Sequence, residues 1–81
     1  MSYFVYMLIS IKKNITYVGY TSNLKKRIEL HNSGKGAKFT RGRKWKLIFF
    51  EKLSTKNEAI SREYYIKKNR KYRNFIKSKH I

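Results

Sequence analysis

The hydrophobic positions of the first twenty residues predict two β-strands joined by a short polar turn. Residues 3–9 are apolar at nearly every position, which is typical of a central strand covered on both faces. Residues 10–14 include two lysines and an asparagine, and residues 15–20 return to β-branched and aromatic side chains. We therefore predict an antiparallel hairpin.

A short amphipathic helix is predicted after this hairpin. Leu24 and Ile28 are spaced i, i+4 and therefore share one helical face. Thr21 or Ser22 is predicted to cap the first turn. The helix should end at Gly34, because glycine suits the left-handed conformation that follows a helix C-terminus.

A third strand is predicted over residues 45–52, after a basic loop. Strict alternation places Leu47 and Phe49 on one face of this strand. Ile48 and Phe50 then lie on the other face.

Two helices are predicted in the C-terminal third. Thr55 and Glu58 have the spacing of a capping box, so a helix should begin near Lys56 and reach Lys68. A further short helix is expected over residues 71–79. Its apolar residues are predicted to face inward: Tyr72, Phe75 and Ile76.

The predicted order is ββαβα(α), which favours an α/β (α+β) fold with a three-stranded antiparallel sheet flanked by helices. The chain has 81 residues, and a domain of this size buries only about 60–65% of its unfolded surface. It has no proline that would mark a linker. We expect a single domain over residues 1–81.

The charge of the chain points to a polyanionic partner. There are 21 Lys and Arg residues against 4 Asp and Glu, for a formal net charge of +17. Such a protein gains affinity for nucleic acid by releasing condensed counterions. An anionic membrane surface is the main rival, but no segment pairs a long apolar face with a basic one. We expect nucleic acid as the partner, and no membrane.

Several other classes of protein are disfavoured. The chain has no cysteine, which excludes disulfides and thiolate metal sites. Its longest apolar run, residues 4–9, is far too short to span a membrane. The N-terminus lacks the layout of a signal peptide. We expect a cytoplasmic protein.

One of the four carboxylates occupies an unusual position. Ala59, Glu63 and Ile66 are spaced i, i+4 and i+7, which places Glu63 within the apolar stripe of its helix. An inward carboxylate is costly unless it is paired or bound to a cation. Two alternatives are open: a salt bridge to a nearby Arg or Lys, or a ligand to Mg²⁺, which often takes only one or two protein carboxylates.

Four polar side chains form a second candidate group. Arg27 and His31 are one helical turn apart beside the apolar stripe, and Tyr6 and Tyr17 lie on adjacent predicted strands. In a basic protein such a helix pair is most often solvated, and a tyrosine in a small core most often packs. Together with Glu63 these groups form a set suited to phosphodiester cleavage.

These residues resemble the GIY-YIG nuclease family. The resemblance covers nearly the whole chain and is closest to the small stand-alone bacterial branch, which carries a segment like NSGKGAKFTRGR after the first helix. The same domain type supplies one incision activity of the bacterial excision-repair endonuclease. The elements occur here in the family's order and spacing: Tyr6 in FVYML, Tyr17-Val18-Gly19, Arg27, His31, and Glu63 in EAISREYYIKK.

The resemblance implies a metal-dependent endonuclease that hydrolyses phosphodiester bonds in DNA, with a role in repair or processing. It implies Mg²⁺ or Mn²⁺ on Glu63, and Arg27 as the cation that neutralises the phosphorane. A tyrosine would be the general base, with Tyr6 preferred to Tyr17. His31 would hydrogen-bond a tyrosine or a phosphate oxygen.

Three further positions bear on the resemblance to the family: Gly19, Phe4 and Tyr20. Gly19 is expected to let the backbone turn and the substrate approach, since it has no side chain. The sequence departs from the family pattern at Phe4, which replaces the glycine of the first motif, and at Tyr20, where the excision-repair type has a lysine. The absent lysine removes a cation that would help deprotonate a phenol or a water.

The basic, glycine-containing loop over residues 34–44 does not match the nucleotide-binding pattern of Gly, four residues and then Gly-Lys-Ser/Thr. Its cations are predicted to clamp the nucleic-acid backbone, and Phe39 to stack on a base. The alternative is a flexible solvated loop. The predicted clamps are Lys35, Lys38, Arg41, Arg43 and Lys44.

Two other functions fit the same charge. A basic module, or a degenerate nuclease, would hold DNA or RNA without cutting it, and would show a steep salt dependence without a metal requirement. A structural RNA-binding protein would also explain the charge, but it leaves the inward position of Glu63 unexplained.

Overall fold

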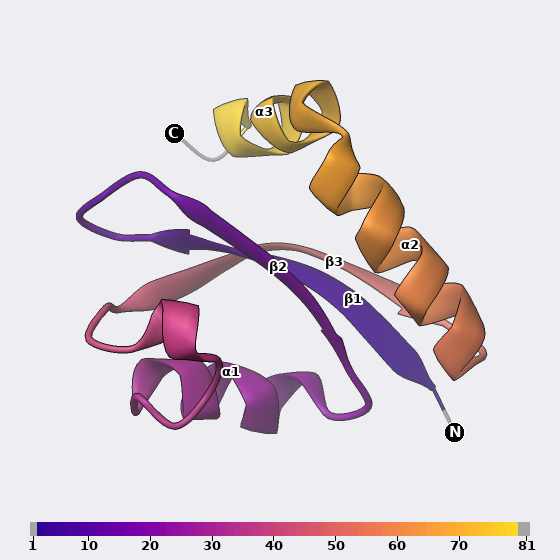
Figure 1. The fold of residues 1–81 in the computed structure, drawn as a ribbon, viewed down its shortest axis with the longest axis horizontal. Coiled ribbons are helices and arrows are strands. Elements are labelled where there is room, and N and C mark those ends of the chain that lie inside the picture. The colour runs from indigo at the N-terminus through magenta and orange to yellow at the C-terminus, as the bar shows by residue number, and fades with distance from the viewer. Residues whose placement is uncertain (1, 80–81) are drawn as a thin grey trace.

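The protein, seen in a computed structural model that describes residues 2–79, has one antiparallel sheet between two helical layers (Figure 1). The strands are β1 (Tyr3–Ser10), β2 (Thr16–Thr21) and β3 (Trp45–Leu53). The helices are α1 (Leu24–Asn32), the short 3₁₀ helix η1 (Lys38–Thr40), α2 (Lys56–Lys68) and α3 (Arg70–Ser78). The strand order is β2-β1-β3 and both pairings are antiparallel. The predicted element order, ββαβαα, and the predicted sheet are confirmed.

The two faces of the central strand β1 contribute to two separate cores. Val5 and Met7 point to the face covered by α2 and α3, where they pack with Ile66. Tyr6 and Leu8 alternate with them and point to the face covered by α1. Figure 1 shows α1 on one side of the sheet and α2 and α3 on the other. Side chains of α1 and α2 can therefore meet only around an edge of the sheet.

A β-bulge in β3 changes which of its residues share a face. Two consecutive residues of β1 pair with Phe49 and Leu47, so Ile48 has no partner of its own. Ile48 and Phe49 consequently both pack on the α2 face, and Phe50 is exposed. The prediction of strict alternation in this strand is wrong, because the inserted residue shifts the pattern by one position.

Local capping chemistry sets the helix starts. Thr55 and Glu58 form the predicted capping box, with both reciprocal hydrogen bonds at 3.1 Å. The cap of α1 is Asn23, whose side-chain oxygen accepts a backbone N–H of the first turn at 3.1 Å. The prediction of Thr21 or Ser22 at this position is wrong. Thr21 instead accepts the backbone N–H of Asn23, so the helix starts later than expected.

The predictions for the end of α1 and for the inward face of α3 are confirmed in part. Gly34 has a φ of +83°, which confirms the predicted left-handed residue after α1. In α3, Tyr72 and Ile76 pack against the core, but Phe75 is exposed and the prediction that it faces inward is wrong. A single short helix packed at the end of the sheet buries only a narrow stripe. No helix within residues 2–79 is long and apolar enough to cross a membrane.

Candidate active site

Side chains from both helical layers meet at one edge of the sheet, where β2 runs. Arg27 comes from α1 and Glu63 from α2, on opposite faces of the sheet (Figure 1). They reach the same pocket, of about 370 Å³, because β2 is an edge strand. The pocket is lined by Tyr6, Tyr17, Gly19, Tyr20, Thr21, Arg27 and Glu63. The structure thus brings together five of the predicted site residues, and the sixth, His31, lies directly behind Tyr6.

Gly19 allows the two tyrosines to stand side by side. It pairs with Tyr6 in the register of β1 and β2. A Cβ atom at Gly19 would lie 2.6 Å from the Tyr6 hydroxyl oxygen and 3.1 Å from a ring carbon of Tyr17. The first distance is shorter than any real contact, so a side chain at this position would displace Tyr6.

We expect Gly19→Ala to lower the free energy of unfolding by about 1–3 kcal/mol, the usual cost of overpacking a filled site. The methyl group would contact Tyr6, which is buried and cannot swing into solvent. Denaturant titration measures the loss, and the NMR resonances of the His31 ring should shift with the displaced phenol. Unchanged stability together with unchanged ring resonances would show that β2 moves aside without cost.

A chain of three hydrogen bonds runs inward from the pocket through His31. The Tyr6 hydroxyl oxygen lies 2.8 Å from His31 Nε2, and His31 Nδ1 lies 2.8 Å from the Thr40 hydroxyl oxygen. The single hydrogen of that threonine hydroxyl is donated to the Ala37 carbonyl oxygen, also at 2.8 Å. Thr40 must therefore accept from His31 Nδ1–H, which leaves Nε2 as the acceptor for the Tyr6 O–H.

His31 is neutral and held away from water. The residue is 0% exposed, and burial together with the positive charge of Arg27 lowers its pKa below 6.5. Gly36 lies against the ring, where a Cβ atom would be 2.6 Å from Nδ1. The interpretation of Arg27 and His31 as a solvated helix face is thus wrong for His31, because the segment after α1 folds back over it.

Tyr6 is a protonated phenol at neutral pH. It is 1% exposed, and burial raises its pKa to about 12, although Arg27 opposes the rise. Tyr6 in turn raises the pKa of Arg27, so the guanidinium stays charged. Since a free phenolate is unfavourable here, Tyr6 can act as a base only if its own proton passes to His31 Nε2 as it accepts another.

Tyr17 forms an aromatic wall of the pocket. Its ring centroid lies 4.9 Å from that of His31 and 6.3 Å from that of Tyr6. The Phe39 ring stacks on Tyr17 with a centroid distance of 6.2 Å and an interplanar angle of 23°. Of the two tyrosines, Tyr6 is the one whose hydroxyl is hydrogen-bonded to the His31 imidazole.

Glu63 is the carboxylate among the residues that line the pocket, and its side chain is 19% exposed. Its nearest cation is Lys67, whose Nζ lies 3.7 Å away, beyond a good hydrogen bond. Arg62 is bound to Glu51 at 2.8 Å instead. Of the two alternatives left open by the sequence, the salt bridge is thus present only as a loose contact on the same helix.

The donor set at the pocket suits a hard divalent cation. No group of three His, Cys, Asp or Glu side chains comes together within the described part of the chain. Zinc requires three or four such ligands. Mg²⁺ commonly keeps several waters and binds one or two carboxylates together with substrate phosphates, so a pocket with the single carboxylate of Glu63 is compatible with Mg²⁺ once a phosphate is present.

The basic loop is partly buried rather than fully solvated. It contains η1, which buries Thr40, and the Trp45 indole N–H donates to the Thr40 carbonyl oxygen at 3.0 Å. Phe39 is 53% exposed beside Tyr17. Within residues 2–79, no predicted clamp of this loop forms an ion pair with a carboxylate. These cations are Lys35, Lys38, Arg41, Arg43 and Lys44.

Sequence reasoning missed the residue that orients the imidazole. Thr40 is nine positions from His31, and its only signal is that it is an uncharged hydroxyl residue within a run of cations. No local pattern indicates which residue of an irregular loop folds back onto a helix. Tyr20 lines the pocket as well, although the sequence marked it only as a departure from the family. His80 lies outside the described residues.

Comparison with known proteins agrees with the geometry. The family model of the GIY-YIG catalytic domain matches residues 2–75. The chain is 56% identical to a UPF0213 protein of Clostridium perfringens over 66 residues, which are 80% of this chain and 70% of that protein. It is 50% identical to the UPF0213 protein YazA of Bacillus subtilis over 64 residues, which are 78% of this chain and 65% of that protein.

A solved structure has the same fold. The solution NMR structure of a UPF0213 protein of Bacillus halodurans superposes with a TM-score of 0.58 and 39% sequence identity. The match covers 96% of this chain and 84% of that chain.

Proposed function

The chain belongs to the GIY-YIG catalytic domain family, and from that membership we propose that it is a metal-dependent endonuclease that hydrolyses phosphodiester bonds in DNA. A role in DNA repair or processing is part of the proposal. The observation that carries it is the hydrogen-bonded pair of Tyr6 and His31 at a pocket lined also by Arg27 and Glu63. A packing core requires none of these polar groups at one place.

The pair of Tyr6 and His31 supplies the general base. A water in the pocket attacks the phosphorus and gives its proton to the Tyr6 oxygen, while the Tyr6 proton passes to His31 Nε2 along the existing hydrogen bond, whose oxygen and nitrogen are 2.8 Å apart. The new bond joins the water oxygen to phosphorus, the bond from phosphorus to the 3′ oxygen breaks, and the 3′ oxygen takes a proton from solvent. His31 ends as an imidazolium and returns its proton to solvent through Tyr6.

Arg27 and Glu63 stabilise the charge of the reacting phosphate, Arg27 directly and Glu63 through the metal that it would hold. The Arg27 guanidinium is always charged and stands beside Tyr6, so it neutralises the extra negative charge of the phosphorane. Glu63 would hold Mg²⁺ or Mn²⁺, which supplies stabilisation of the charge that develops on the leaving 3′ oxygen. Thr40 holds the imidazole in the tautomer that can accept a proton.

The second candidate function is a basic module that binds DNA or RNA without cutting it. The net charge of +17 favours this alternative, as does Tyr20 at the position where the excision-repair type has a lysine. His31 weakens the argument from Tyr20, because the imidazole already supplies an acceptor for the phenol proton. The cleavage function is therefore preferred.

The proposal predicts cleavage that depends on a divalent metal. The protein is incubated with labelled single-stranded, duplex and branched DNA in Mn²⁺, in Mg²⁺, and in chelator. Cutting of at least one substrate is expected with metal and is expected to stop in chelator, because the stabilisation of the negative leaving oxygen comes from the cation and not from the anionic Glu63 carboxylate. Binding should persist in chelator, since the basic surface remains.

Two results would contradict this prediction. Tight binding to all substrates without cutting in either metal would favour the basic module. Cutting that continues in excess chelator would remove the metal from the mechanism and Glu63 from its role.

A further inference from the structure

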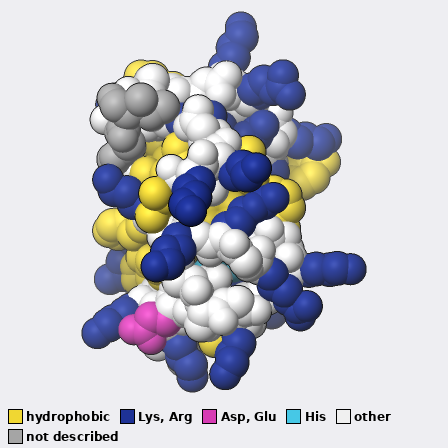
Figure 2. All heavy atoms as spheres, turned by 90° about the vertical axis from the view of Figure 1, so that its left-hand side faces the viewer, with side chains coloured by type: hydrophobic (Ala, Val, Ile, Leu, Met, Phe, Trp, Pro, Cys, Tyr) yellow, Lys and Arg dark blue, Asp and Glu magenta, His cyan; other side chains and the backbone are white. Residues whose placement is uncertain are grey.

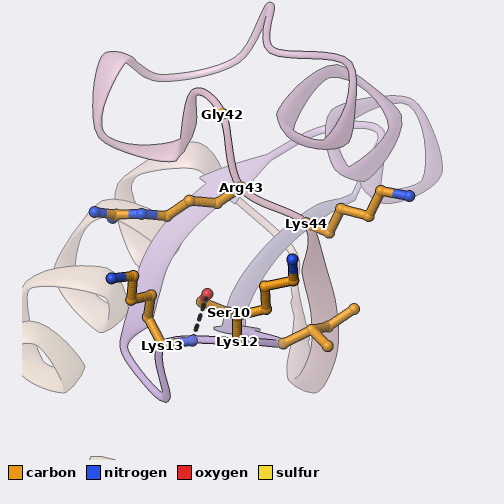
Figure 3. A pocket seen from close by; sticks show the side chains of 7 residues that line it. Ser10, Lys12, Lys13, Gly42, Arg43 and Lys44 are labelled. Carbon is orange, nitrogen blue, oxygen red and sulfur yellow. Dashed lines mark hydrogen bonds between the residues drawn. The ribbon is translucent and has the colours of Figure 1, made fainter.

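A second pocket lies at the end of the sheet where β1 turns into β2. It has a volume of about 400 Å³ and is formed where the β1–β2 hairpin meets the segment that precedes β3 (Figure 3). Its lining residues come from these two segments only: Ser10, Ile11, Lys12, Lys13, Gly42, Arg43 and Lys44. We refer to it below as the hairpin pocket.

The hairpin pocket has a fixed frame. The backbone N–H of Ile11 donates to the Lys44 carbonyl oxygen at 3.1 Å, which joins the two segments. Ser10 N–H donates to Ile15 O at 2.8 Å and closes the turn. On its outer side the turn is held by Lys77 of α3, whose Nζ donates to the Asn14 carbonyl oxygen at 2.7 Å. The side chains that line the pocket are therefore carried by anchored backbone.

Cations border the hairpin pocket, while the surface inside it is mostly apolar. Four cations line it, and none of them forms an ion pair with a carboxylate within residues 2–79. Figure 3 shows Arg43 and Lys13 extending on one side and Lys12 and Lys44 on the other, with Ser10 between them. The Ser10 hydroxyl accepts the Lys13 backbone N–H at 3.2 Å and keeps its own hydrogen as a donor.

The surrounding surface supports a polyanion rather than a small ion. In Figure 2, which views this end of the molecule, Lys and Arg side chains surround exposed apolar atoms, and acidic side chains appear only near the lower edge. Ile11 contributes to the apolar part of the pocket and is largely exposed. Alternating cationic and apolar surface suits a strand of nucleic acid, which presents phosphates and bases in turn.

A continuous line of contacts joins the hairpin pocket to the candidate active site. The Arg43 guanidinium carbon lies 5.3 Å from the centre of the Phe39 ring. Phe39 in turn stacks on Tyr17 at 6.2 Å. Ser10 and Tyr6 are four residues apart on the same face of β1, which corresponds to about 13 Å at the rise of a strand. This separation is larger than one phosphate group, so the two pockets would take different phosphates of one strand.

We propose that the hairpin pocket is a second phosphate-binding subsite, in which Lys12 and Lys13 with Arg43 and Lys44 hold the DNA backbone at a phosphate other than the scissile one. Phe39 lies between the two sites and offers its exposed ring to a base. The subsite positions the DNA strand on the protein. It takes no part in the cleavage of the phosphodiester bond. The inference rests on the proposed action on DNA.

The test uses the double variant Lys12→Gln, Lys13→Gln and a matched control, Lys52→Gln, Lys56→Gln. Both variants lose two exposed lysines, and the control pair lies at the far end of the sheet and the start of α2. DNA binding is measured in chelator over a range of salt concentrations. We expect about a tenfold weaker Kd for the hairpin variant, and a slope of log Kd against log salt lower by about 1.4–1.8, since each phosphate contact contributes about 0.7–0.9. The control variant should leave both the Kd and the salt slope close to their wild-type values.

A second measurement locates the contact. NMR titration of the labelled protein with single-stranded DNA should shift the backbone amides of Ser10 and Gly42 with the same Kd as that of Gly19. If cleavage is observed, the hairpin variant should raise KM about tenfold and leave kcat unchanged. Equal salt slopes for the hairpin variant and the control, or amides of Ser10 and Gly42 that do not shift, would overturn the subsite.

Failure of the subsite and failure of the proposed function are separate results. A protein that never cuts DNA but loses affinity and salt dependence in the hairpin variant has the subsite without the nuclease. A protein that cuts DNA while the hairpin variant binds normally has the nuclease without the subsite.

Discussion

Glu63→Gln is expected to reduce metal-dependent cleavage by at least about a thousandfold and to leave DNA binding in chelator unchanged or slightly stronger. Glu63 is the carboxylate that lines the pocket, so no neighbouring side chain there can replace it as a ligand to a divalent cation. Glutamine keeps the shape of the side chain but loses its charge. The loss of charge stabilisation at a leaving oxygen is worth several kcal/mol.

The fold should not be affected by this change. The ion pair to Lys67 spans 3.7 Å on one helix, and such i, i+4 pairs contribute only about 0.2–0.5 kcal/mol. Glu51→Gln is the matched control, because it removes a carboxylate with a closer partner, Arg62 at 2.8 Å, that does not line the active-site pocket. Single-turnover cleavage and a Mn²⁺ titration measure both variants. A Glu63→Gln protein that cuts as fast as the Glu51→Gln protein would show that the metal, if used, is held elsewhere.

Tyr6→Phe is expected to lower kcat by about a hundredfold to a thousandfold, within the range typical of general acid–base groups. The variant removes the oxygen that takes the proton of the attacking water and leaves His31 Nε2 buried without a donor. An unpaired buried acceptor costs about 1–3 kcal/mol, so the unfolding free energy should fall by a similar amount. Tyr17→Phe is the matched control and should lower kcat less than tenfold.

The pH dependence distinguishes the relay from a simple phenolate base. His31 must be neutral to accept the Tyr6 proton, and its pKa lies below 6.5. The wild-type rate should therefore be constant from about pH 7 to 9 and fall at lower pH, as Nε2 becomes protonated. A phenolate acting alone, with the pKa of Tyr6 at about 12, would give a rate that rises tenfold per pH unit over the same range. The acidic limb should disappear in Tyr6→Phe.

Stability should follow the same titration. The folded state binds a proton at His31 less readily than the unfolded state, because the pKa is lowered on folding. The contribution of the buried neutral ring is therefore complete above pH 6.5 and is lost as the pH falls below that value. Denaturant titrations between pH 5 and 8 measure this loss. A cleavage rate that rises through pH 9, or stability that does not fall in acid, would contradict the neutral, buried state of His31.

The helix and strand assignments made from the sequence were correct where the signal is local. The capping box of Thr55 and Glu58 depends on two residues three positions apart, and the apolar run of β1 on consecutive side chains, so both can be read directly. The face assignment in β3 was wrong, because the bulge at Ile48 arises from pairing with β1 rather than from the strand's own sequence. The inward position of Phe75 was wrong for a similar reason, since the core that covers α3 is small.

The sequence by itself determined which groups were available. Helical spacing placed Arg27 and His31 one turn apart, the hydrophobic pattern marked Glu63 as unusual, and the excess of Lys and Arg pointed to nucleic acid. Each of these three inferences depends on composition or on residues close together in the chain. None of them requires knowledge of three-dimensional contacts.

Only the tertiary structure decided which of these groups lie together. The edge position of β2 lets α1 and α2, which lie on opposite faces of the sheet, present Arg27 and Glu63 to the same pocket. Thr40 folds back onto His31 and fixes its tautomer, and the hairpin lysines meet Arg43 and Lys44. The physical reason is that loop paths and edge contacts depend on how the whole chain packs, which no periodicity or spacing along the sequence encodes.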